Sequence, residues 1–223
     1  MLVRGLISIL APRTCYGCNR PGTSLCLECL KRYVEPRQPH CFECQWGWRL
    51  GTTCLSCAPD VSLVGTVVAT RYTGLVRTLM RRLKQSPDVR IAELFGKLLA
   101  RRIMHIPVRP TLITLMPTSP GRYRERGYNP AELIARTVAR ELVLPCRPTL
   151  LRLTTKHQMG LDRMDRRLQI TGAFVMRGGA HVRGETIVII DDVMTTGASL
   201  NEAARELTES GANWVWGAAV ARR

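Results

Sequence analysis

The spacing of apolar and polar positions changes at about residue 60. Before it, short apolar runs are broken by cysteine, glycine and proline; after it, apolar residues recur periodically over long segments. Short apolar runs bounded by turn residues are typical of strands, and apolar residues three and four positions apart are typical of helices. The pattern predicts strands over residues 61–72, 111–116, 186–193 and 214–220. It predicts helices over residues 74–84, 88–105 and 129–144, and a last helix that ends at Ser210 before Gly211.

Strands that alternate with helices indicate a mostly parallel sheet, because the chain crosses over from one parallel strand to the next through a helix. We therefore expect an α/β fold with helices on both faces of the sheet. The expected domains are a small cysteine-rich domain over residues 1–60 and a sheet domain over residues 61–223. With 45% apolar and 22% charged residues among 223, the chain has enough apolar material for a buried core, which excludes a disordered protein.

Eight of the nine cysteines precede residue 58, and they form four C-x-x-C pairs. Two thiolates separated by two residues can reach one tetrahedral ion from a tight turn, and two such pairs complete a four-sulfur zinc shell. Seven residues separate the first two pairs and nine separate the last two, which favours two successive zinc ribbons; an interleaved pairing is the alternative. The expected ligands are Cys15, Cys18, Cys26 and Cys29 for one ion, and Cys41, Cys44, Cys54 and Cys57 for the other.

The composition of this region explains why it would need metal. Glycines and prolines are frequent between Thr14 and Pro59 and long apolar runs are few, so burial alone could not offset the entropy of ordering the segment. The two expected Zn²⁺ ions are therefore structural, since nothing in the pattern indicates the open coordination position of a catalytic zinc. His40 precedes Cys41, and we interpret it as a bystander rather than a ligand.

The segment from Ile187 to Ser199 reads IVIIDDVMTTGAS and carries the strongest functional pattern. Its apolar residues predict a buried strand, and the small residues that follow turn the chain into a helix. Free N–H groups, hydroxyls and the dipole at a helix start favour a phosphate, and Gly197 lets the backbone approach it closely. The expected phosphate-binding residues are Thr195, Thr196, Gly197, Ala198 and Ser199. Ser199 with Glu202 also matches a capping box, which would give Ser199 a purely structural role.

Asp191 and Asp192, at the end of that strand, are the catalytic candidates. Neighbouring strand residues point to opposite faces, so we do not expect these carboxylates to share a proton. We expect them to accept hydrogen bonds from sugar hydroxyls or to hold Mg²⁺ through water, because ligands of α/β proteins lie beyond the carboxyl ends of the strands. A solvated strand end is the alternative.

The charge balance favours a polyanionic partner. The chain has 33 Lys and Arg against 17 Asp and Glu, a net charge of +16, and 29 of the cations are arginines, which grip phosphates through a planar fork. Residues 1–60 contribute +3 and residues 61–223 contribute +13.

No apolar stretch approaches the roughly 20 residues of a membrane span, and the apolar start is short for a signal peptide, so we expect a cytoplasmic location.

Together these motifs resemble a known family. Residues 187–199 are similar to the motif with which type I phosphoribosyltransferases bind 5-phosphoribosyl-1-diphosphate (PRPP), and cysteine pairs in front of such a domain resemble the ComF family, also called ComFC or GntX-like. Further stretches that carry the likeness are Arg71–Gly74 with Lys84, Met116–Pro120 with Arg122–Asn129, and a run with His157, Gln158, Leu161, Arg166 and Gly172–Phe174.

The resemblance implies a type I phosphoribosyltransferase-like fold with a PRPP site. In that site the bend 195–199 would hold the 5-phosphate, and Asp191 and Asp192 would hold the ribose hydroxyls. The residues implied for the diphosphate and its Mg²⁺ are Thr118, Ser119, Arg122 and Arg126. A stretch with Arg163, Arg166 and Arg167 would fold over the site as a flap, with a solvated helix as the alternative.

Two functions follow from the resemblance. ComF proteins help to bring single-stranded DNA into the cytoplasm in natural transformation, alongside a ComFA-type ATPase. The first function is therefore that of a DNA-uptake protein, cytoplasmic or peripheral to the inner face of the membrane, with a retained PRPP-type ligand site. The alternative is an active phosphoribosyltransferase, a pentosyltransferase that moves ribose 5-phosphate from PRPP to an acceptor that the sequence does not identify.

Overall fold

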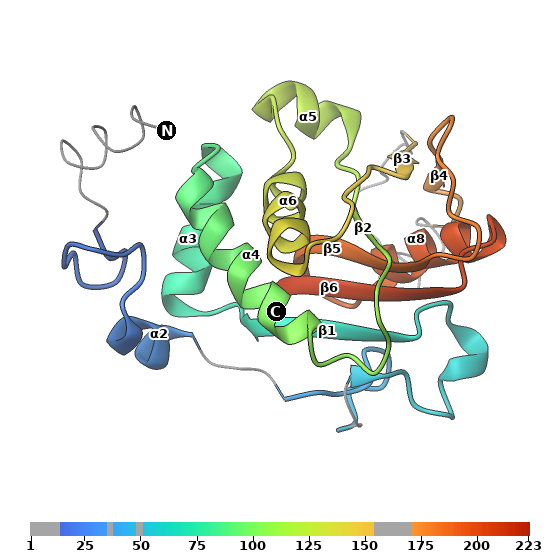
Figure 1. The fold of residues 1–223 in the computed structure, drawn as a ribbon, viewed down its shortest axis with the longest axis horizontal. Coiled ribbons are helices and arrows are strands. Elements are labelled where there is room, and N and C mark those ends of the chain that lie inside the picture. Colours follow the sequence, from blue (N-terminus) through green and yellow to red (C-terminus); the bar gives the residue numbers. More distant parts are fainter. Residues whose placement is uncertain (1–13, 35–37, 48–50, 154–170) are drawn as a thin grey trace, which may run out of the picture.

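Four parallel strands form the central sheet of the computed structural model within residues 14–34, 38–47, 51–153 and 171–223, which are the residues that the structure describes (Figure 1). They are β1 (Gly65–Arg71), β2 (Leu112–Leu115), β5 (Thr186–Met194) and β6 (Trp214–Arg222), in the order β1-β6-β5-β2. The apolar run from Ile187 to Ile190 is buried because it lies in an inner strand that is covered on both faces.

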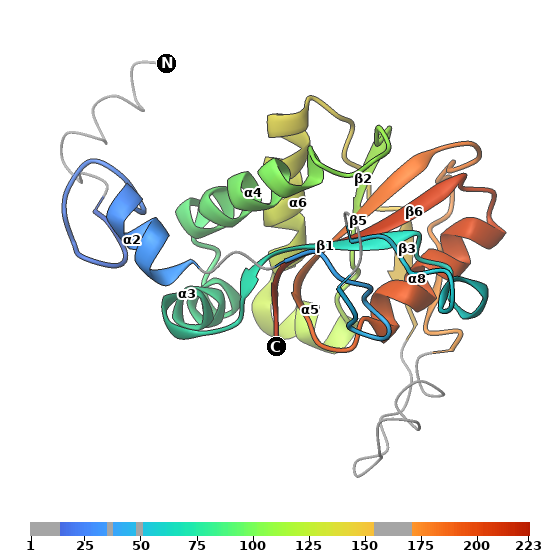
Figure 2. The same cartoon turned by 90° about the horizontal axis from the view of Figure 1, so that it is seen from below.

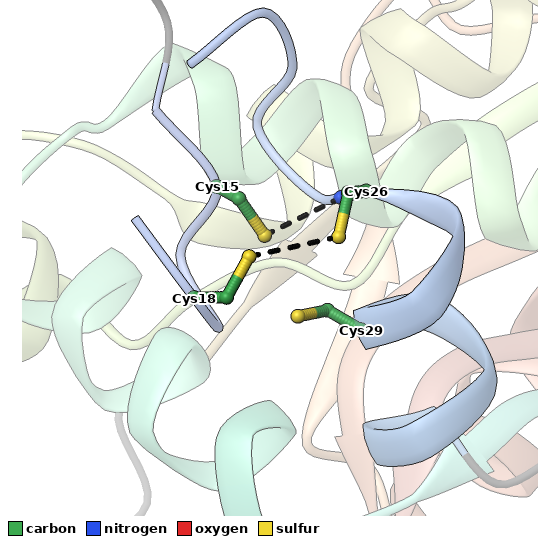
Figure 3. A group of neighbouring side chains, drawn as sticks. All are labelled: Cys15, Cys18, Cys26 and Cys29. Atoms are coloured by element: carbon green, nitrogen blue, oxygen red, sulfur yellow. Dashed lines mark hydrogen bonds between the residues drawn. The ribbon is translucent and has the colours of Figure 1, made fainter. Parts of the chain in front are cut away.

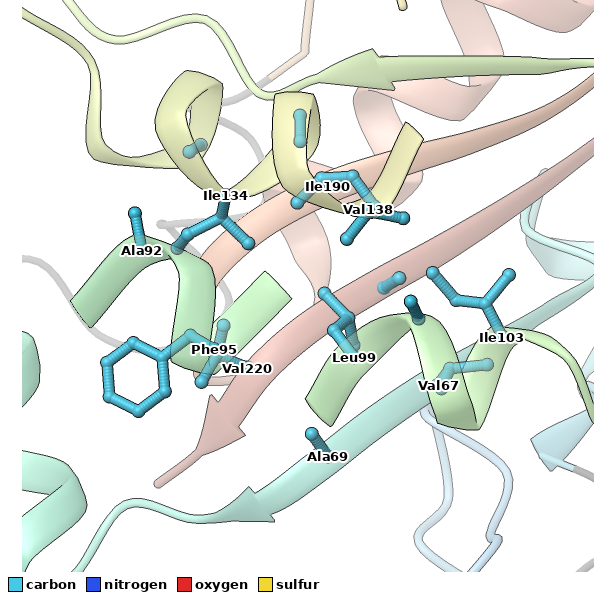
Figure 4. Close-up of a cluster of buried hydrophobic side chains, with 14 of the residues drawn as sticks. Val67, Ala69, Ala92, Phe95, Leu99, Ile103, Ile134, Val138, Ile190 and Val220 are labelled. Atoms are coloured by element: carbon cyan, nitrogen blue, oxygen red, sulfur yellow. The ribbon is translucent and has the colours of Figure 1, made fainter. Parts of the chain in front are cut away.

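Helices cover both faces of the sheet, as predicted (Figure 2). On one face lie α3 (Gly74–Gln85), α4 (Val89–Ile103) and α6 (Pro130–Leu142). Their buried side chains, such as Phe95 and Ile134, share one core with Ile190 and Val220 of the sheet (Figure 4). The second core lies on the other face, where Leu200 and Leu207 of α8 (Ala198–Glu209) pack with Ile187 and Ile189. The expected α/β fold class is confirmed.

The predicted elements exist, with boundaries that differ by a few residues. The first predicted strand begins at Gly65 rather than at residue 61, and the last one continues to Arg222, two residues beyond its predicted end. Helix α6 begins after the predicted N-cap, Asn129, and ends at Leu142 because Val143 takes a left-handed conformation with φ 55°.

Three short elements of the sheet domain were not predicted. Helix α5 (Pro120–Arg126) lies in a stretch for which the pattern of apolar positions predicts neither helix nor strand. Strands β3 (Leu150–Arg152) and β4 (Phe174–Met176) pair antiparallel in a separate two-stranded sheet. Strands of three residues are too short to show a period, which explains why the pattern of apolar positions misses them.

The cysteine-rich region lies against the sheet domain at two places. Helix α2 (Leu27–Tyr33), which contains the fourth cysteine, contacts α3. The segment that ends in the short helix η2 (Ala58–Asp60) runs along the free edge of β1, where Thr52 bridges Gly65. Figure 1 shows the two places at different ends of the molecule, with α2 beside α3. The domain boundary at residue 60 stays a prediction.

None of the described helices is long and apolar enough to cross a membrane. The apolar start of the chain lies outside the described residues, as do His157, Gln158, Leu161 and the arginines of the expected flap, Arg163, Arg166 and Arg167.

Candidate functional site

A polar cavity of about 220 Å³ lies at the carboxyl ends of β2 and β5. Its wall includes the loop after β2, α5, the end of β3 and the first turn of α8. The charged residues of the wall are Lys84, Arg122, Arg126, Arg152, Asp191 and Asp192. Four cations and two carboxylates together suit an anion that is accompanied by a divalent cation.

The unequal lengths of β2 and β5 open this cavity. Strand β2 pairs with β5 only as far as Leu115, opposite Ile190, whereas β5 continues to Met194. The edge of β5 beyond Ile190 is therefore left unpaired by β2, and Asp191 and Asp192 both line the cavity there. Neighbouring strand residues are expected to point to opposite faces, but one cavity reaches both carboxylates, because β2 does not cover this part of β5.

The two carboxylates have different surroundings. Asp192 forms an ion pair with Lys84 of α3, at 2.9 Å between Oδ2 and Nζ, and its backbone N–H donates to Oδ1 of Asp191 at 2.8 Å. Burial, followed by the negative charge of Asp192, raises the pKa of Asp191 to about 7, although this hydrogen bond and the charges of Lys84 and Arg152 act in the opposite direction. Asp191 is therefore half-ionised near neutral pH, and a cation at the site would favour its charged form.

Helix α5 brings the two predicted arginines to the cavity. Ser119 caps it, since its hydroxyl accepts a hydrogen bond from the N–H of Arg122 at 3.4 Å, and Gly127 ends it with a φ of 74°. Arg122 and Arg126 are four residues apart and so share one side of the helix, and both line the cavity with Thr118 and Ser119. All four residues implied for the diphosphate thus meet at one wall.

Asn129 fixes the loop between β2 and α6. Its side-chain NH₂ donates to the carbonyl of Met116 at 2.9 Å, and its side-chain oxygen accepts from the N–H of Ala131 at 3.1 Å. Asn129 is 7% exposed, so both bonds are shielded from water. One side chain thereby caps α6 and holds the strand end from which the cavity wall begins.

The predicted phosphate bend contributes less to the cavity wall than expected. Ser199 lines the cavity, whereas Thr195, Thr196, Gly197 and Ala198 lie outside its lining. The hydroxyl of Thr196 accepts from the N–H of Ala198 at 3.3 Å, so it stabilises the turn itself. The bend still leads directly into α8, whose N-terminus favours an anion.

Gly197 has a second reason to be glycine. Its φ of +89° disfavours any side chain, and a Cβ atom there would lie 2.8 Å from Cδ2 of Phe42. From the sequence, only the approach of a phosphate would call for a glycine here. The structure adds the aromatic ring of a residue between two cysteines, which occupies one side of the bend.

Lys84 and Arg152 are site residues that the sequence analysis did not assign. Lys84 entered only through the family resemblance, and it lies near the end of a helix that the cavity touches. Arg152 comes from the unpredicted strand β3, and its guanidinium carbon lies 5.6 Å from the centre of the Phe174 ring. Burial, followed by the charge of Arg122, lowers the pKa of Arg152. No sequence pattern pointed to it, because its position depends on the pairing of β3 with β4.

The eight predicted metal ligands gather in two groups of four sulfur atoms, the first of which is drawn in Figure 3. They are Cys15, Cys18, Cys26 and Cys29 in the first cluster, and Cys41, Cys44, Cys54 and Cys57 in the second cluster. Within each group the sulfur atoms lie within 4.8 Å of one another. The grouping is the successive one, not the interleaved alternative, and His40 belongs to neither group.

The donor set of each cluster fits a tetrahedral metal ion. Burial raises the pKa of Cys15, but backbone N–H groups of Cys26 and Gly17 outweigh it and lower the pKa to about 6. Burial and the neighbouring thiols raise the pKa of Cys29 to about 12. Four thiols this close cannot all ionise beside one another, and a divalent cation removes that restriction. Each cluster can therefore hold a metal ion, for which zinc is the usual choice with four cysteines.

The fold and the site together define the class of this protein. A parallel sheet with helices on both faces, paired aspartates at a strand end and a turn into a helix make up a type I phosphoribosyltransferase-like domain. A family model described as "Phosphoribosyl transferase domain" matches residues 129–223, which contain β5, the bend and α8.

Curated relatives confirm the resemblance to the ComF family. Competence protein ComFC of Streptococcus pneumoniae is 24% identical over 84% of this chain and 83% of its own length. Competence protein F of Haemophilus influenzae is 28% identical over 98% of this chain and 95% of its own length. DNA utilization protein YhgH of Salmonella typhi is 29% identical over 89% of this chain and 84% of its own length. The chain is thus a homologue of ComF proteins that carries two four-cysteine clusters and a phosphoribosyltransferase domain.

Proposed function

We propose that this protein binds PRPP, or a closely related ribose 5-phosphate, together with Mg²⁺ in the cavity at the ends of β2 and β5, and that it handles single-stranded DNA in natural transformation. The observation that carries the ligand site is the convergence of Asp191 and Asp192 with Arg122, Arg126 and the start of α8 on one cavity of about 220 Å³.

Each part of the cavity suits one part of the ligand. The first turn of α8 with Ser199 would take the 5-phosphate, since helix N-termini favour anions. Asp191 and Asp192 would accept hydrogen bonds from the ribose hydroxyls, and the loop and helix from Thr118 to Arg126 would receive the diphosphate. When bound, Mg²⁺ would supply charge neutralisation for the diphosphate, which is the leaving group in phosphoribosyl transfer.

The residues fit electrostatic positioning better than proton transfer. Lys84 neutralises Asp192 through an ion pair of 2.9 Å, so this carboxylate is held in place as an anion. Asp191, whose pKa is about 7, would lose its proton when a cation or a sugar hydroxyl donor occupies the site. We therefore expect ligand affinity to rise with pH between about 6 and 8, as Asp191 ionises.

Binding of the ligand is tested by calorimetric titration with Mg²⁺ and PRPP. We expect binding to wild type, and a loss of at least about tenfold in affinity for Asp192→Asn and for Arg122→Gln, each of which removes a charged partner. The matched control is Arg136→Gln on α6, because Arg136 is exposed and pairs locally with Glu132 four residues earlier. Wild type that gives no heat and no thermal shift with PRPP and Mg²⁺ would refute the ligand site.

The DNA role is supported by the charge and by the relatives. The net charge of +16 comes mostly from arginines of residues 61–223, and the relatives are named competence and DNA utilization proteins. We expect a single-stranded oligonucleotide to bind with a steep salt dependence, since each neutralised phosphate releases counterions. Fluorescence anisotropy at several salt concentrations measures this slope. A flat slope, or no binding at low salt, contradicts a DNA role and leaves the ligand site standing.

The alternative function is catalytic turnover, and the cavity is the observation that favours it. Two carboxylates beside arginines at the diphosphate wall are what departure of diphosphate from ribose requires. The measurement is release of inorganic diphosphate from PRPP, alone and with a panel of nucleobases or single-stranded DNA as acceptors. Turnover that Asp192→Asn abolishes supports a transferase; tight binding without turnover supports a ligand-sensing role in DNA handling.

The cellular setting belongs to the same proposal. A protein that handles imported DNA would act in the cytoplasm or at the inner face of the membrane, with a ComFA-type ATPase as a partner. In each cluster the metal would be a structural zinc ion. Metal analysis of the purified protein should give about two zinc ions per chain.

A further inference from the structure

Arg222 joins the phosphate bend to the second cluster. It lies at the end of β6, is 4% exposed, and its guanidinium donates three hydrogen bonds. Nε donates to the carbonyl of Thr195 at 3.1 Å, Nη1 to Nε2 of His40 at 3.1 Å, and Nη2 to the carbonyl of Phe42 at 3.0 Å. One of these partners belongs to the bend, and the other two flank Cys41.

The imidazole of His40 can accept the hydrogen bond that Arg222 donates. Its Nδ1 lies 2.8 Å from the carbonyl of Gln38, which can only accept, so Nδ1 carries the proton. Nε2 is then the acceptor for Arg222. His40 is thus no metal ligand, as expected, but as the neighbour of Cys41 it links Arg222 to the second cluster.

Phe42 makes a second, apolar link between the same two parts. Its side chain is 1% exposed and packs in the core with Met194 and Leu200, which flank the bend. The ring also occupies the position that a Cβ atom of Gly197 would need. Phe42 lies between Cys41 and Cys44, so the shape of the metal-binding turn decides where its ring stands. Figure 2 shows this segment, in blue, beside α8.

The bond to Thr195 orients the peptide that follows. In a trans peptide the carbonyl and the next N–H point in opposite directions. Arg222 holds the Thr195 carbonyl toward itself, so the N–H of Thr196 points away from it. An anion at the bend needs N–H donors that are turned outward, and a peptide free to flip would present a carbonyl oxygen instead.

We propose that Arg222 is a positioning residue through which the second cluster controls the phosphate bend, so that metal in that cluster sets the affinity for the 5-phosphate. This inference rests on the proposed ligand site and adds its regulation. The first cluster is the natural comparison, because it packs at the other end of the molecule, where the hydroxyl of Tyr16 donates to Asp88 at 2.9 Å.

Two probes separate positioning from general destabilisation. Ribose 5-phosphate uses the bend, whereas inorganic diphosphate with Mg²⁺ uses the wall formed by Arg122 and Arg126. Calorimetric titration of Arg222→Gln should show affinity for ribose 5-phosphate reduced about tenfold and affinity for diphosphate unchanged, because one charge-assisted bond no longer holds the bend. Arg223→Gln is the matched control, since it removes the same charge one residue later from an exposed side chain.

The conservative variant tests whether geometry or charge matters. Arg222→Lys keeps the charge, but a lysine cannot reach three separate acceptors with a planar fork. We expect it to recover only part of the affinity for ribose 5-phosphate. Wild-type affinity in Arg222→Lys would show that charge alone acts, which would overturn the proposal.

The role of the second cluster is tested with a pair of equivalent cysteines, one from each cluster. Cys44→Ser and Cys18→Ser each change the second, exposed cysteine of a C-x-x-C pair, in the second and first cluster respectively. Both should lose about one zinc ion per chain by metal analysis, but only Cys44→Ser should weaken ribose 5-phosphate binding, by a factor similar to that of Arg222→Gln. Equal effects of the two cysteine variants, or none, overturn the control by the second cluster. If wild type itself binds no ribose 5-phosphate or PRPP, the proposed function fails, and that outcome is distinct from wild-type affinity in Arg222→Gln.

Discussion

Replacement of Asp191 by asparagine should stabilise the ligand-free protein, and the gain should depend on pH. The pKa of Asp191 rises from 3.8 to about 7 because burial and Asp192 disfavour its charge. In the unfolded chain the carboxyl ionises at its ordinary pKa, so between about pH 4 and 7 the folded state binds more protons than the unfolded state. The free energy of unfolding therefore falls as the pH rises through this window.

The magnitude follows from the width of the window. A shift of about three pKa units at roughly 1.4 kcal/mol per unit sets a ceiling of about 4 kcal/mol, reached above about pH 7. The asparagine side chain would carry no charge, and its oxygen could still accept the hydrogen bond that the N–H of Asp192 donates. Relative to wild type, Asp191→Asn should therefore gain about 4 kcal/mol at most at about pH 8 and less than about 2 kcal/mol at about pH 5.

Equilibrium unfolding in urea at about pH 5, 6, 7 and 8, with buffered zinc, measures this difference. The difference between the unfolding free energies of the two proteins at each pH is free of contributions from the cysteines and from every other group that titrates equally in both. Addition of Mg²⁺ and PRPP should reverse the order, because ligand stabilises wild type but not the variant. A difference that stays constant with pH, or an Asp191→Asn protein that is less stable at the alkaline end, would refute the electrostatic reasoning.

Three further predictions concern the frame of the site. Lys84→Met removes the charge that opposes protonation of Asp191, so the pH dependence of unfolding should move to higher pH; an unmoved profile would exclude this coupling. Asn129→Ala loses the cap of α6 and the bond to Met116, and should cost about 2 kcal/mol in urea unfolding, whereas a neutral effect would contradict the role of Asn129. Gly96→Ala places a Cβ atom 2.5 Å from Cβ of Thr137, where α4 crosses α6, and should lower the free energy of unfolding by about 1–3 kcal/mol. Thermal melting measures this loss, and an unchanged melting temperature would show that the two helices can move apart without cost.

The sheet domain could be predicted because each long element carries its own pattern. The run Ile187–Ile190 is buried on both faces and so is apolar at every position, and Asn129 before Pro130 marks a helix start by local chemistry alone. The short spacing of the eight cysteines likewise predicts the two clusters, because both ligands of a pair come from one turn. In each case the residues that determine the local structure are neighbours in the sequence, so the sequence pattern is enough to predict it.

The missed parts depend on distant partners. Arg152 reaches the cavity only because Leu150–Arg152 pairs with Phe174–Met176, a strand far along the chain. Burial is the largest cause of the raised pKa of Asp191, and that burial depends on elements far along the chain that no local pattern shows. Gly197 appeared to serve only the phosphate because nothing in residues 187–199 indicates the ring of Phe42.

The bend is consequently held by residues that are far apart in the sequence. The hydrogen bond between Arg222 and the carbonyl of Phe42 joins residues 180 positions apart. The same guanidinium also donates to the carbonyl of Thr195, which lies between these two residues in the sequence. The side chains of the bend are small and pack weakly, and within it the hydroxyl of Thr196 accepts one hydrogen bond, from the N–H of Ala198. Contacts from outside the bend add to this order. The last strand supplies the buried Arg222, and the two neighbours of Cys41 supply a carbonyl, an imidazole and an aromatic ring. The proposed phosphate site and the second cluster are therefore in physical contact through these residues.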